Sequence, residues 1–264
     1  MRIVVCVKHV PDMQSERRFE GGRLVRGEDD VLNELDENAI EAAVQLKESE
    51  EDAGREAEVV ALTMGPEDAE DSLMRALQMG ADRAYIVSDE FLEGSDVITT
   101  ASVLAVAIAK ISEECGPVDL VITGMASLDA MTSMLPGALA AKAHMPLLGL
   151  ARSLSVADGA VTIERAVDGS TETVRAALPA VVSVTDQINE PRYPAFAAMK
   201  AARKKPLDQW GIDDLVEVPG GEGLVMRRAL TAVTHGEENG SGTIIQDAGE
   251  GGRALADYIL SVVK

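Results

Sequence analysis

Three loops carry residue types that could bind a small ligand. They are residues 9–13 (HVPDM), 63–66 (TMGP) and 124–129 (GMASLD), the last leading into Thr132 and Ser133. Each follows an apolar run that predicts a buried strand, and α/β proteins bind ligands at the carboxyl ends of parallel strands. Their small residues would let a ligand approach the backbone, and the first amides of a following helix could hold a phosphate. The alternative is that these are ordinary strand-to-helix turns with capping residues.

Other kinds of chemistry lack their characteristic residues in this sequence. No GxGxxG follows a strand and no GxxxxGK[ST] occurs, so a dinucleotide dehydrogenase and a P-loop protein are not predicted. His9, His144 and His235 are far apart and lack the spacing of metal ligands. There is no GxSxG and no evident nucleophile–base pair. The many carboxylates are typical of solvated faces, so we expect neither acid–base catalysis nor a metal site.

A stiff, aromatic loop is the second informative feature. Residues 189–194 (NEPRYP) contain two prolines and Tyr193, and Phe196 follows two residues later, in a chain that is only 3% aromatic. Prolines restrict the backbone and withhold donors, which suits a surface presented to a partner. The basic run 200–205 follows, and it is either a solvated helix end or a segment that docks on an acidic surface.

The bulk properties narrow the class of protein. The 264 residues carry a formal net charge of −21, which disfavours phosphate-rich polymers, so we expect no nucleic-acid partner. Cys6 lies in an apolar strand and is expected to be a buried thiol, without a disulfide framework. Neither a signal peptide nor an apolar run of about 20 residues is present, which predicts a cytoplasmic protein without direct membrane insertion.

Strand and helix patterns alternate through the first 143 residues. Asp36 is expected to be the N-cap of the first helix, whose apolar residues recur at helical spacing. Such alternation predicts an α/β fold with a mostly parallel, Rossmann-like sheet flanked by helices. The expected strands are residues 2–8, 58–63, 83–87 and 118–123, and the later long helices are residues 96–114 and 132–143.

The pattern changes after residue 145. Asp158-Gly159 and Asp168-Gly169 are turn signals between short strands, so we expect an antiparallel hairpin extension of the sheet. From Pro206 the chain is loop-like and too poor in apolar residues to form its own core. We therefore predict a nucleotide-binding-like α/β domain at 1–205 and an extended C-terminal arm at 206–264 that packs on another chain.

Several blocks of sequence together resemble one known family. The opening Val7 to Asp12 (VKHVPD) resembles the family's V-K-x-V-x-D motif, and further blocks follow in order to about residue 206. The chain on these grounds resembles the β subunit of electron transfer flavoprotein, which has an adenine-nucleotide α-hydrolase-like fold. The other matching blocks are Asn33 with residues 36–43 and 46–48, residues 65–66, 76–83, 178–182 and 189–193, and residues 199–201.

The resemblance implies an electron carrier rather than an enzyme. Members of the family pair with an α subunit as a heterodimer and move electrons from acyl-CoA dehydrogenases and other flavin dehydrogenases toward a quinone oxidoreductase and the membrane quinone pool. The redox FAD is held mainly by the α subunit, and many β subunits bury a structural AMP. The implied setting is fatty acid β-oxidation.

The resemblance also implies roles for particular residues. It places Met13 near the flavin ring and makes Phe196 an apolar anchor for the partner dehydrogenase, with Pro191, Arg192 and Tyr193 in the same docking loop. No catalytic or metal-binding residue is implied. The residues implied around AMP are Cys6, Asn33, Met64, Gly65, Gly124 and Thr132.

One loop departs from the family pattern. Many relatives have a longer D-x-D-x-x-Q-T-G-Q segment, whereas here only Ala130 and Met131 separate Asp129 from Thr132. The shorter loop lacks side chains that would help to hold a phosphate. This weakens the expectation of AMP, and it argues against a second FAD of the kind found in electron-bifurcating relatives.

Two other functions fit parts of the sequence. One is a stand-alone adenine-nucleotide-binding regulatory domain of the stress-protein type, with the tail as a homodimer arm. The other is an enzyme that acts on adenylates. The first does not explain the loop at 189–193, and the second lacks a phosphate-activating motif.

Overall fold

The computed structural model describes residues 1–27, 29–224, 249 and 251–262. The chain divides into two compact units, residues 1–231 and 232–264, which are described separately. No helix among the described residues is long and apolar enough to cross a membrane. The same residues contain no group of three or more His, Cys, Asp or Glu side chains arranged to hold a metal ion.

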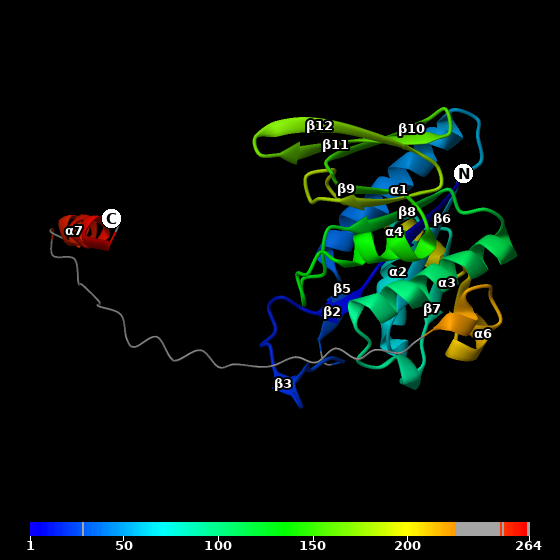
Figure 1. Ribbon diagram of the computed structural model, residues 1–264, viewed down its shortest axis with the longest axis horizontal. Helices are drawn as coiled ribbons and strands as arrows, with labels where there is room; N and C mark the ends of the chain where they lie inside the picture. The colour runs from blue at the N-terminus through cyan, green and yellow to red at the C-terminus, as the bar shows by residue number, and fades with distance from the viewer. Residues whose placement is uncertain (28, 225–248, 250, 263–264) are drawn as a thin grey trace. The chain divides into compact units, whose positions relative to one another are not determined.

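A seven-stranded sheet forms the centre of the first unit (Figure 1). Every adjacent pair of its strands is parallel, and the strand order is β14-β7-β6-β1-β8-β13-β9. The predicted α/β class with a mostly parallel sheet is therefore confirmed. The strands are β1 (Arg2–Cys6), β6 (Glu58–Met64), β7 (Arg83–Val87), β8 (Leu120–Gly124), β9 (Leu147–Ala151), β13 (Ala180–Val184) and β14 (Leu207–Trp210).

Helices cover both faces of this sheet. Ile40 of α1 (Glu34–Asp52) and Leu73 of α2 (Glu70–Met79) share one buried cluster with Ile3 of β1. The helices α3 (Val97–Cys115) and α4 (Leu135–Ala143) pack on the opposite face with Val4 and Cys6. The remaining helical segments of this unit are α5 (Phe196–Ala202), α6 (Ile212–Val216) and the 3₁₀ turns η1 (Glu67–Ala69), η2 (Glu90–Leu92) and η3 (Gly221–Gly223).

The predicted antiparallel hairpins are present, but they do not continue the main sheet. The strands β10 (Ser153–Ala157), β11 (Ala160–Val167) and β12 (Ser170–Ala177) form a separate three-stranded sheet. β9 and β13, on either side of it in sequence, instead pair with each other in parallel. Two small antiparallel pairs complete the unit, β2 (His9–Pro11) with β5 (Asp30–Leu32) and β3 (Phe19–Glu20) with β4 (Arg23–Leu24).

Two predicted helix starts are wrong. α1 begins at Glu34 with Asn33 as its N-cap, because the carboxylate of Asp36 accepts the backbone N–H of Lys8 instead of capping its own helix. α4 begins at Leu135 rather than at Thr132. Met131 and Ser133 have positive φ angles of 49° and 51°, which interrupt the helical path before that point.

The segment after Pro206 is partly folded into the first unit. β14 pairs with β7 and places the only tryptophan, Trp210, against Tyr85, with ring centroids 4.3 Å apart. The second unit contains the helix α7 (Gly251–Val262), which buries no residue. Residues 225–248 of the predicted arm lie outside the described residues, so its packing on another chain stays a prediction.

Candidate functional site

Asn33 joins two loops at the carboxyl edge of the sheet. Cys6 of β1 is in register with Thr123 of β8, so the loops that follow these strands start side by side. The side chain of Asn33 donates to the carbonyl of Ala126 at 3.0 Å and accepts the N–H of Leu128 at 3.0 Å. Asn33 is completely buried, so its amide holds the loop after β8 against the start of α1.

Only glycine fits at position 124, because residues of α1 leave no room for a side chain there. A Cβ atom at Gly124 would lie 2.5 Å from a carboxylate oxygen of Asp36 and 2.7 Å from the carbonyl oxygen of Leu35. Such distances are impossible for real side chains, so only glycine lets α1 approach β8 this closely. The glycine thus serves helix–sheet packing.

Two buried ionisable groups lie beside this contact. Burial raises the pKa of the Asp36 carboxyl to about 7, against the hydrogen bonds from its neighbours. Burial, with a smaller contribution from Asp36, raises the pKa of the Cys6 thiol to about 12. Cys6 is therefore a protonated, inert thiol, as predicted from the apolar run around it.

A charged cluster lies next to these residues. The side chain of Asp129 is only 1% exposed, and the ammonium of Lys8 contacts both of its carboxylate oxygens at 2.9 and 3.0 Å. Arg26 also donates to Asp129, and Lys8 donates to the hydroxyl of Ser127 at 3.3 Å. Burial opposes ionisation of Asp129, but Lys8 and Arg26 hold its pKa well below the usual range. The three side chains form an ionic cluster of two cations and one anion.

Two of the residues implied around AMP, Asn33 and Gly124, are occupied by contacts within the protein. The amide of Asn33 is used by the backbone, and Leu35 and Asp36 fill the space beside Gly124. Asp129 pairs with both Lys8 and Arg26, which leaves one net positive charge in this group. These contacts leave neither the amide of Asn33 nor the space beside Gly124 open to a ligand. The structure therefore gives Asn33 and Gly124 structural roles, and no step is assigned to AMP.

The other residues implied for this site lie around the same edge or beyond it. Met64 ends β6, the neighbour of β1, and Gly65 donates its N–H to the carbonyl of Val87 at 3.1 Å. Thr132 lies in the exposed loop before α4. Met13 follows β2 and exposes 57% of its surface. No described contact joins Met13 or Thr132 to the cluster around Asn33.

The loop at 189–194 is fastened to α1. The side chains of Asn38 and Asn189 exchange hydrogen bonds with each other's backbone carbonyls at 3.1 and 3.0 Å. Arg192 then pairs with two carboxylates of the same helix, Glu41 and Glu48, at 2.7 and 2.6 Å. Burial opposes ionisation of Glu41, but the hydrogen bonds from Arg192 outweigh it and lower the pKa of that carboxyl.

This fastened loop presents two aromatic side chains outward. Tyr193 is 84% exposed and Phe196, the first residue of α5, is 80% exposed, whereas Pro194 between them is buried. The guanidinium of Arg75, from α2, lies 5.5 Å from the centre of the Tyr193 ring. An exposed aromatic pair on an anchored loop has the form of a contact surface for another protein.

The basic run after this loop is partly structural. The ammonium of Lys205 donates to the carbonyls of Leu77 and Ala81 at 3.0 and 2.5 Å, at the C-terminal end of α2. Lysine is favourable there because it satisfies the last carbonyls of the helix and its dipole. Lys200, Arg203 and Lys204 are exposed. These three fit the solvated interpretation, Lys205 has a structural role that neither interpretation expected, and docking on an acidic surface stays a prediction.

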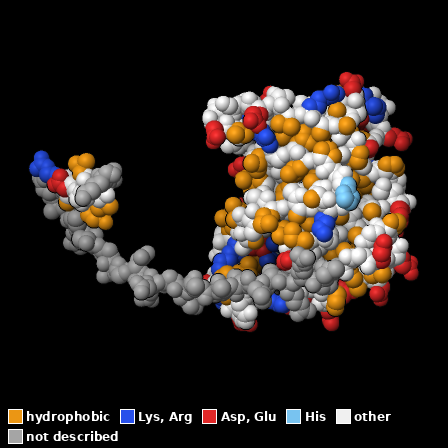
Figure 2. All heavy atoms as spheres, in the orientation of Figure 1, with side chains coloured by type: hydrophobic (Ala, Val, Ile, Leu, Met, Phe, Trp, Pro, Cys, Tyr) orange, Lys and Arg blue, Asp and Glu red, His pale blue; other side chains and the backbone are white. Residues whose placement is uncertain are grey.

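An apolar surface covers α4 and β9. Met131, Met134, Leu147 and Leu150 are each 44% to 56% exposed, and Figure 2 shows hydrophobic side chains over these elements. No Asp or Glu occurs from residue 130 to residue 157, although the chain has 45 acidic residues. Exposed apolar surface without acidic residues is unusual in so negative a protein, and it indicates contact with a partner.

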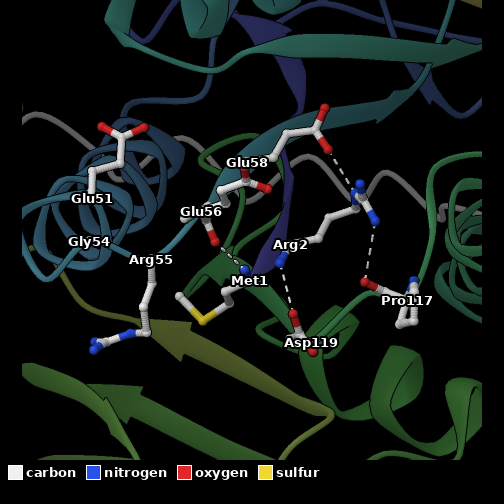
Figure 3. Close-up of a pocket in the computed structure, with 10 residues that line it drawn as sticks. Met1, Arg2, Glu51, Gly54, Arg55, Glu56, Glu58, Pro117 and Asp119 are labelled. Carbon is white, nitrogen blue, oxygen red and sulfur yellow. Dashed lines mark hydrogen bonds and ion pairs between the residues drawn. The ribbon is translucent and has the colours of Figure 1, made fainter.

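A hollow of about 740 Å³ lies at the opposite end of the sheet, away from the ligand-binding edge predicted from the strands (Figure 3). Its polar groups bond to one another: Arg2 pairs with Glu58 at 2.8 Å, and its N–H bonds to Asp119 at 2.8 Å. These contacts tie together the amino ends of β1, β6 and the segment before β8. We assign no ligand to this hollow, because Arg2, Glu58 and Asp119 of its lining serve to join these strands.

Several of these contacts cannot be predicted from local patterns. Asp129 was within a predicted loop, but its partners Lys8 and Arg26 lie more than 100 residues away in sequence. The pairing of Arg192 with α1 likewise spans 144 to 151 residues.

Comparison with known proteins settles the family. The sequence model of the electron transfer flavoprotein domain matches residues 22–215. The chain belongs to the electron transfer flavoprotein family. It is 37% identical over 269 aligned residues to the β subunit from Mycobacterium leprae, covering 98% of this chain and 97% of the relative. As an electron transfer flavoprotein chain of β-subunit type, it is an electron carrier rather than an enzyme.

Two further relatives show the breadth of the family. CarD, a subunit of the caffeyl-CoA reductase–Etf complex of Acetobacterium woodii, is 32% identical, with 85% of this chain and 83% of CarD covered. Protein FixA of Azorhizobium caulinodans is 36% identical, with 77% and 73% covered.

Proposed function

We propose that this β subunit pairs with an FAD-bearing α subunit and receives electrons from acyl-CoA dehydrogenases and other flavin dehydrogenases. The complex passes them to a quinone oxidoreductase and so to the membrane quinone pool, from the cytoplasmic side. The β subunit contributes no bond-making step. It shields the flavin of its partner, with Met13 on the flavin side, and it supplies the surface on which the donor docks.

The docking loop carries this proposal. Tyr193 and Phe196 are almost fully exposed, yet the loop behind them is fixed by Asn189 and Arg192 to α1. Solvent-exposed aromatic side chains on a rigid support are the usual energetic centre of a protein interface. We assign Phe196 as the anchor of the donor, with Pro191 and Tyr193 beside it.

The α subunit has its own candidate contacts. The acid-free surface of α4 and β9 offers Met131, Met134, Leu147 and Leu150. The helix α7 adds exposed apolar residues that its own unit does not bury, among them Leu255 and Tyr258. We propose that the arm which packs on the α subunit comes from the predicted range 206–264, beyond the part that β14 and α6 hold in the first unit.

AMP is not needed for this function. Asn33 and Gly124, two of the residues implied around it, are engaged in internal contacts, so we propose that the Asn33 and Asp129 contacts hold this edge of the fold without it. FAD in the α subunit is the cofactor of the complex.

The test is electron delivery to the purified complex. The chain is co-expressed with its α subunit, and the complex is mixed with an acyl-CoA dehydrogenase reduced by its substrate. We expect the flavin absorbance of the complex to bleach on mixing. A complex whose flavin is reduced by dithionite but by none of a panel of flavin dehydrogenases would contradict the proposal. A colourless homodimer would support the stress-protein type of regulator instead.

A further inference from the structure

We propose that Arg192 is a positioning residue, which fixes the docking loop for the electron donor and does not itself contact the donor. This inference rests on the proposed function and assigns a part of its mechanism. The family resemblance placed Arg192 in the docking loop with Pro191 and Tyr193, without separating residues that touch the donor from residues that position the loop.

The guanidinium of Arg192 is already committed within the chain. Its Nε and Nη2 donate to the two oxygens of Glu41 at 2.7 and 3.1 Å, and its Nη1 and Nη2 donate to those of Glu48 at 2.6 and 2.9 Å. Four of the five N–H groups of an arginine are thereby used. Fork-shaped pairs of this kind fix geometry as well as charge, and lysine cannot reproduce them.

The burial of its partner makes this pairing rigid. The side chain of Glu41 is 5% exposed and also accepts a hydrogen bond from Gln45 at 2.8 Å. The backbone N–H of Arg192 donates to Glu41 as well, at 3.2 Å, so this carboxylate holds both the side chain and the main chain of the loop. Glu48 is 51% exposed, so water screens its share of the interaction.

The loop needs such support because its tip has little packing of its own. Tyr193 and Phe196 are 84% and 80% exposed. An unfastened tip would have to be ordered each time a donor binds, which raises the cost of docking. Once the donor is docked, the distance over which electrons travel is unchanged. Arg192 should therefore affect the KM for the complex as electron acceptor and not kcat.

The experiment compares four holo heterodimers with an acyl-CoA dehydrogenase as donor. They are wild type, Arg192→Gln, the double variant Glu41→Gln/Glu48→Gln, and the matched control Glu51→Gln/Asp52→Asn, which removes the same charge from the end of α1. We expect KM to rise roughly twofold to tenfold in both the arginine and the Glu41/Glu48 variants, the factor expected from ordering one or two side chains. The control should keep the wild-type KM, and kcat should be constant throughout.

The double glutamate variant separates positioning from direct contact. If Arg192 touches the donor, releasing it from Glu41 and Glu48 leaves KM unchanged or lowers it, and that result would overturn the proposal. Hydrogen exchange provides a second measurement: amides of residues 189–196 should exchange faster in both variants, while those of α1 stay as in wild type. Unchanged exchange in this loop would also overturn it. Failure of the proposed function itself is recognised separately, because wild type would then accept no electrons.

Discussion

Replacing Phe196 by alanine should weaken docking of the donor and leave the rest of the protein intact. The side chain is 80% exposed at the first position of α5, so its removal opens no cavity, and the free energy of unfolding should change by no more than about 0.5 kcal/mol. If a donor pocket buries the ring fully, the lost free energy of docking is about 1.5–3 kcal/mol. That corresponds to a rise in KM of roughly tenfold to 150-fold.

The assay measures steady-state reduction of the holo complex by an acyl-CoA dehydrogenase, together with flavin content from the visible spectrum. Phe91→Ala is the matched control, because Phe91 is 57% exposed in η2, outside the docking loop. We expect a normal flavin content in both variants and a raised KM only for Phe196→Ala. An unchanged KM, or a loss of flavin with normal docking, would refute the assignment of Phe196 as the anchor.

The remaining predictions concern stability and assembly. The raised pKa of Asp36 means that the folded chain keeps a proton which the unfolded chain loses above its ordinary 3.8, so this group lowers stability as pH rises from about 4 to about 7. Asp36→Asn should therefore gain up to about 4 kcal/mol over wild type across that range, measured by urea unfolding at several pH values. Gly124→Ala should cost at least about 1–3 kcal/mol through its clash with Leu35 and Asp36. Leu147→Glu should weaken association with the α subunit, measured by the yield of heterodimer on co-purification.

Each of these predictions has its own control. A stability difference between Asp36→Asn and wild type that is the same at every pH would contradict the raised pKa. Gly137→Ala should be tolerated, because the nearest atom to its added Cβ is 3.9 Å away. If Gly124→Ala is as stable as wild type, the close approach of α1 to β8 at this position is wrong. The control for Leu147→Glu is Val167→Glu, because Val167 on β11 has a similar exposure of 37%. If Leu147→Glu and Val167→Glu lose the same amount of heterodimer, the surface around Leu147 is not the contact with the α subunit.

The sequence predicted the elements better than their connections. β7 is observed at the predicted residues 83–87, because it is bounded by Gly80 and by polar residues that leave little choice. The hairpins were identified from Asp-Gly turns, but their membership of a separate sheet depends on which strands are adjacent in space. Asp36 was expected to cap its own helix. Its carboxylate instead accepts the backbone N–H of Lys8, a contact that local spacing in the sequence does not reveal.

The same limit applies to the candidate site. Asn33 and Gly124 could be selected by their place at the carboxyl edge, yet their roles became clear only through contacts with Ala126 and Leu35. The aromatic loop could be predicted as a surface because prolines and exposed aromatics are local signals. Its fastening by Arg192 could not, because charge pairs between distant segments leave no periodic trace in a sequence.

The most direct test of the central claim is the composition of the complex that the chain forms with its α subunit. We predict that the co-purified protein is a yellow heterodimer with one copy of each chain and one FAD, measured by native mass spectrometry and the visible spectrum. A chain that remains a colourless monomer or homodimer in the presence of its α subunit would contradict the account.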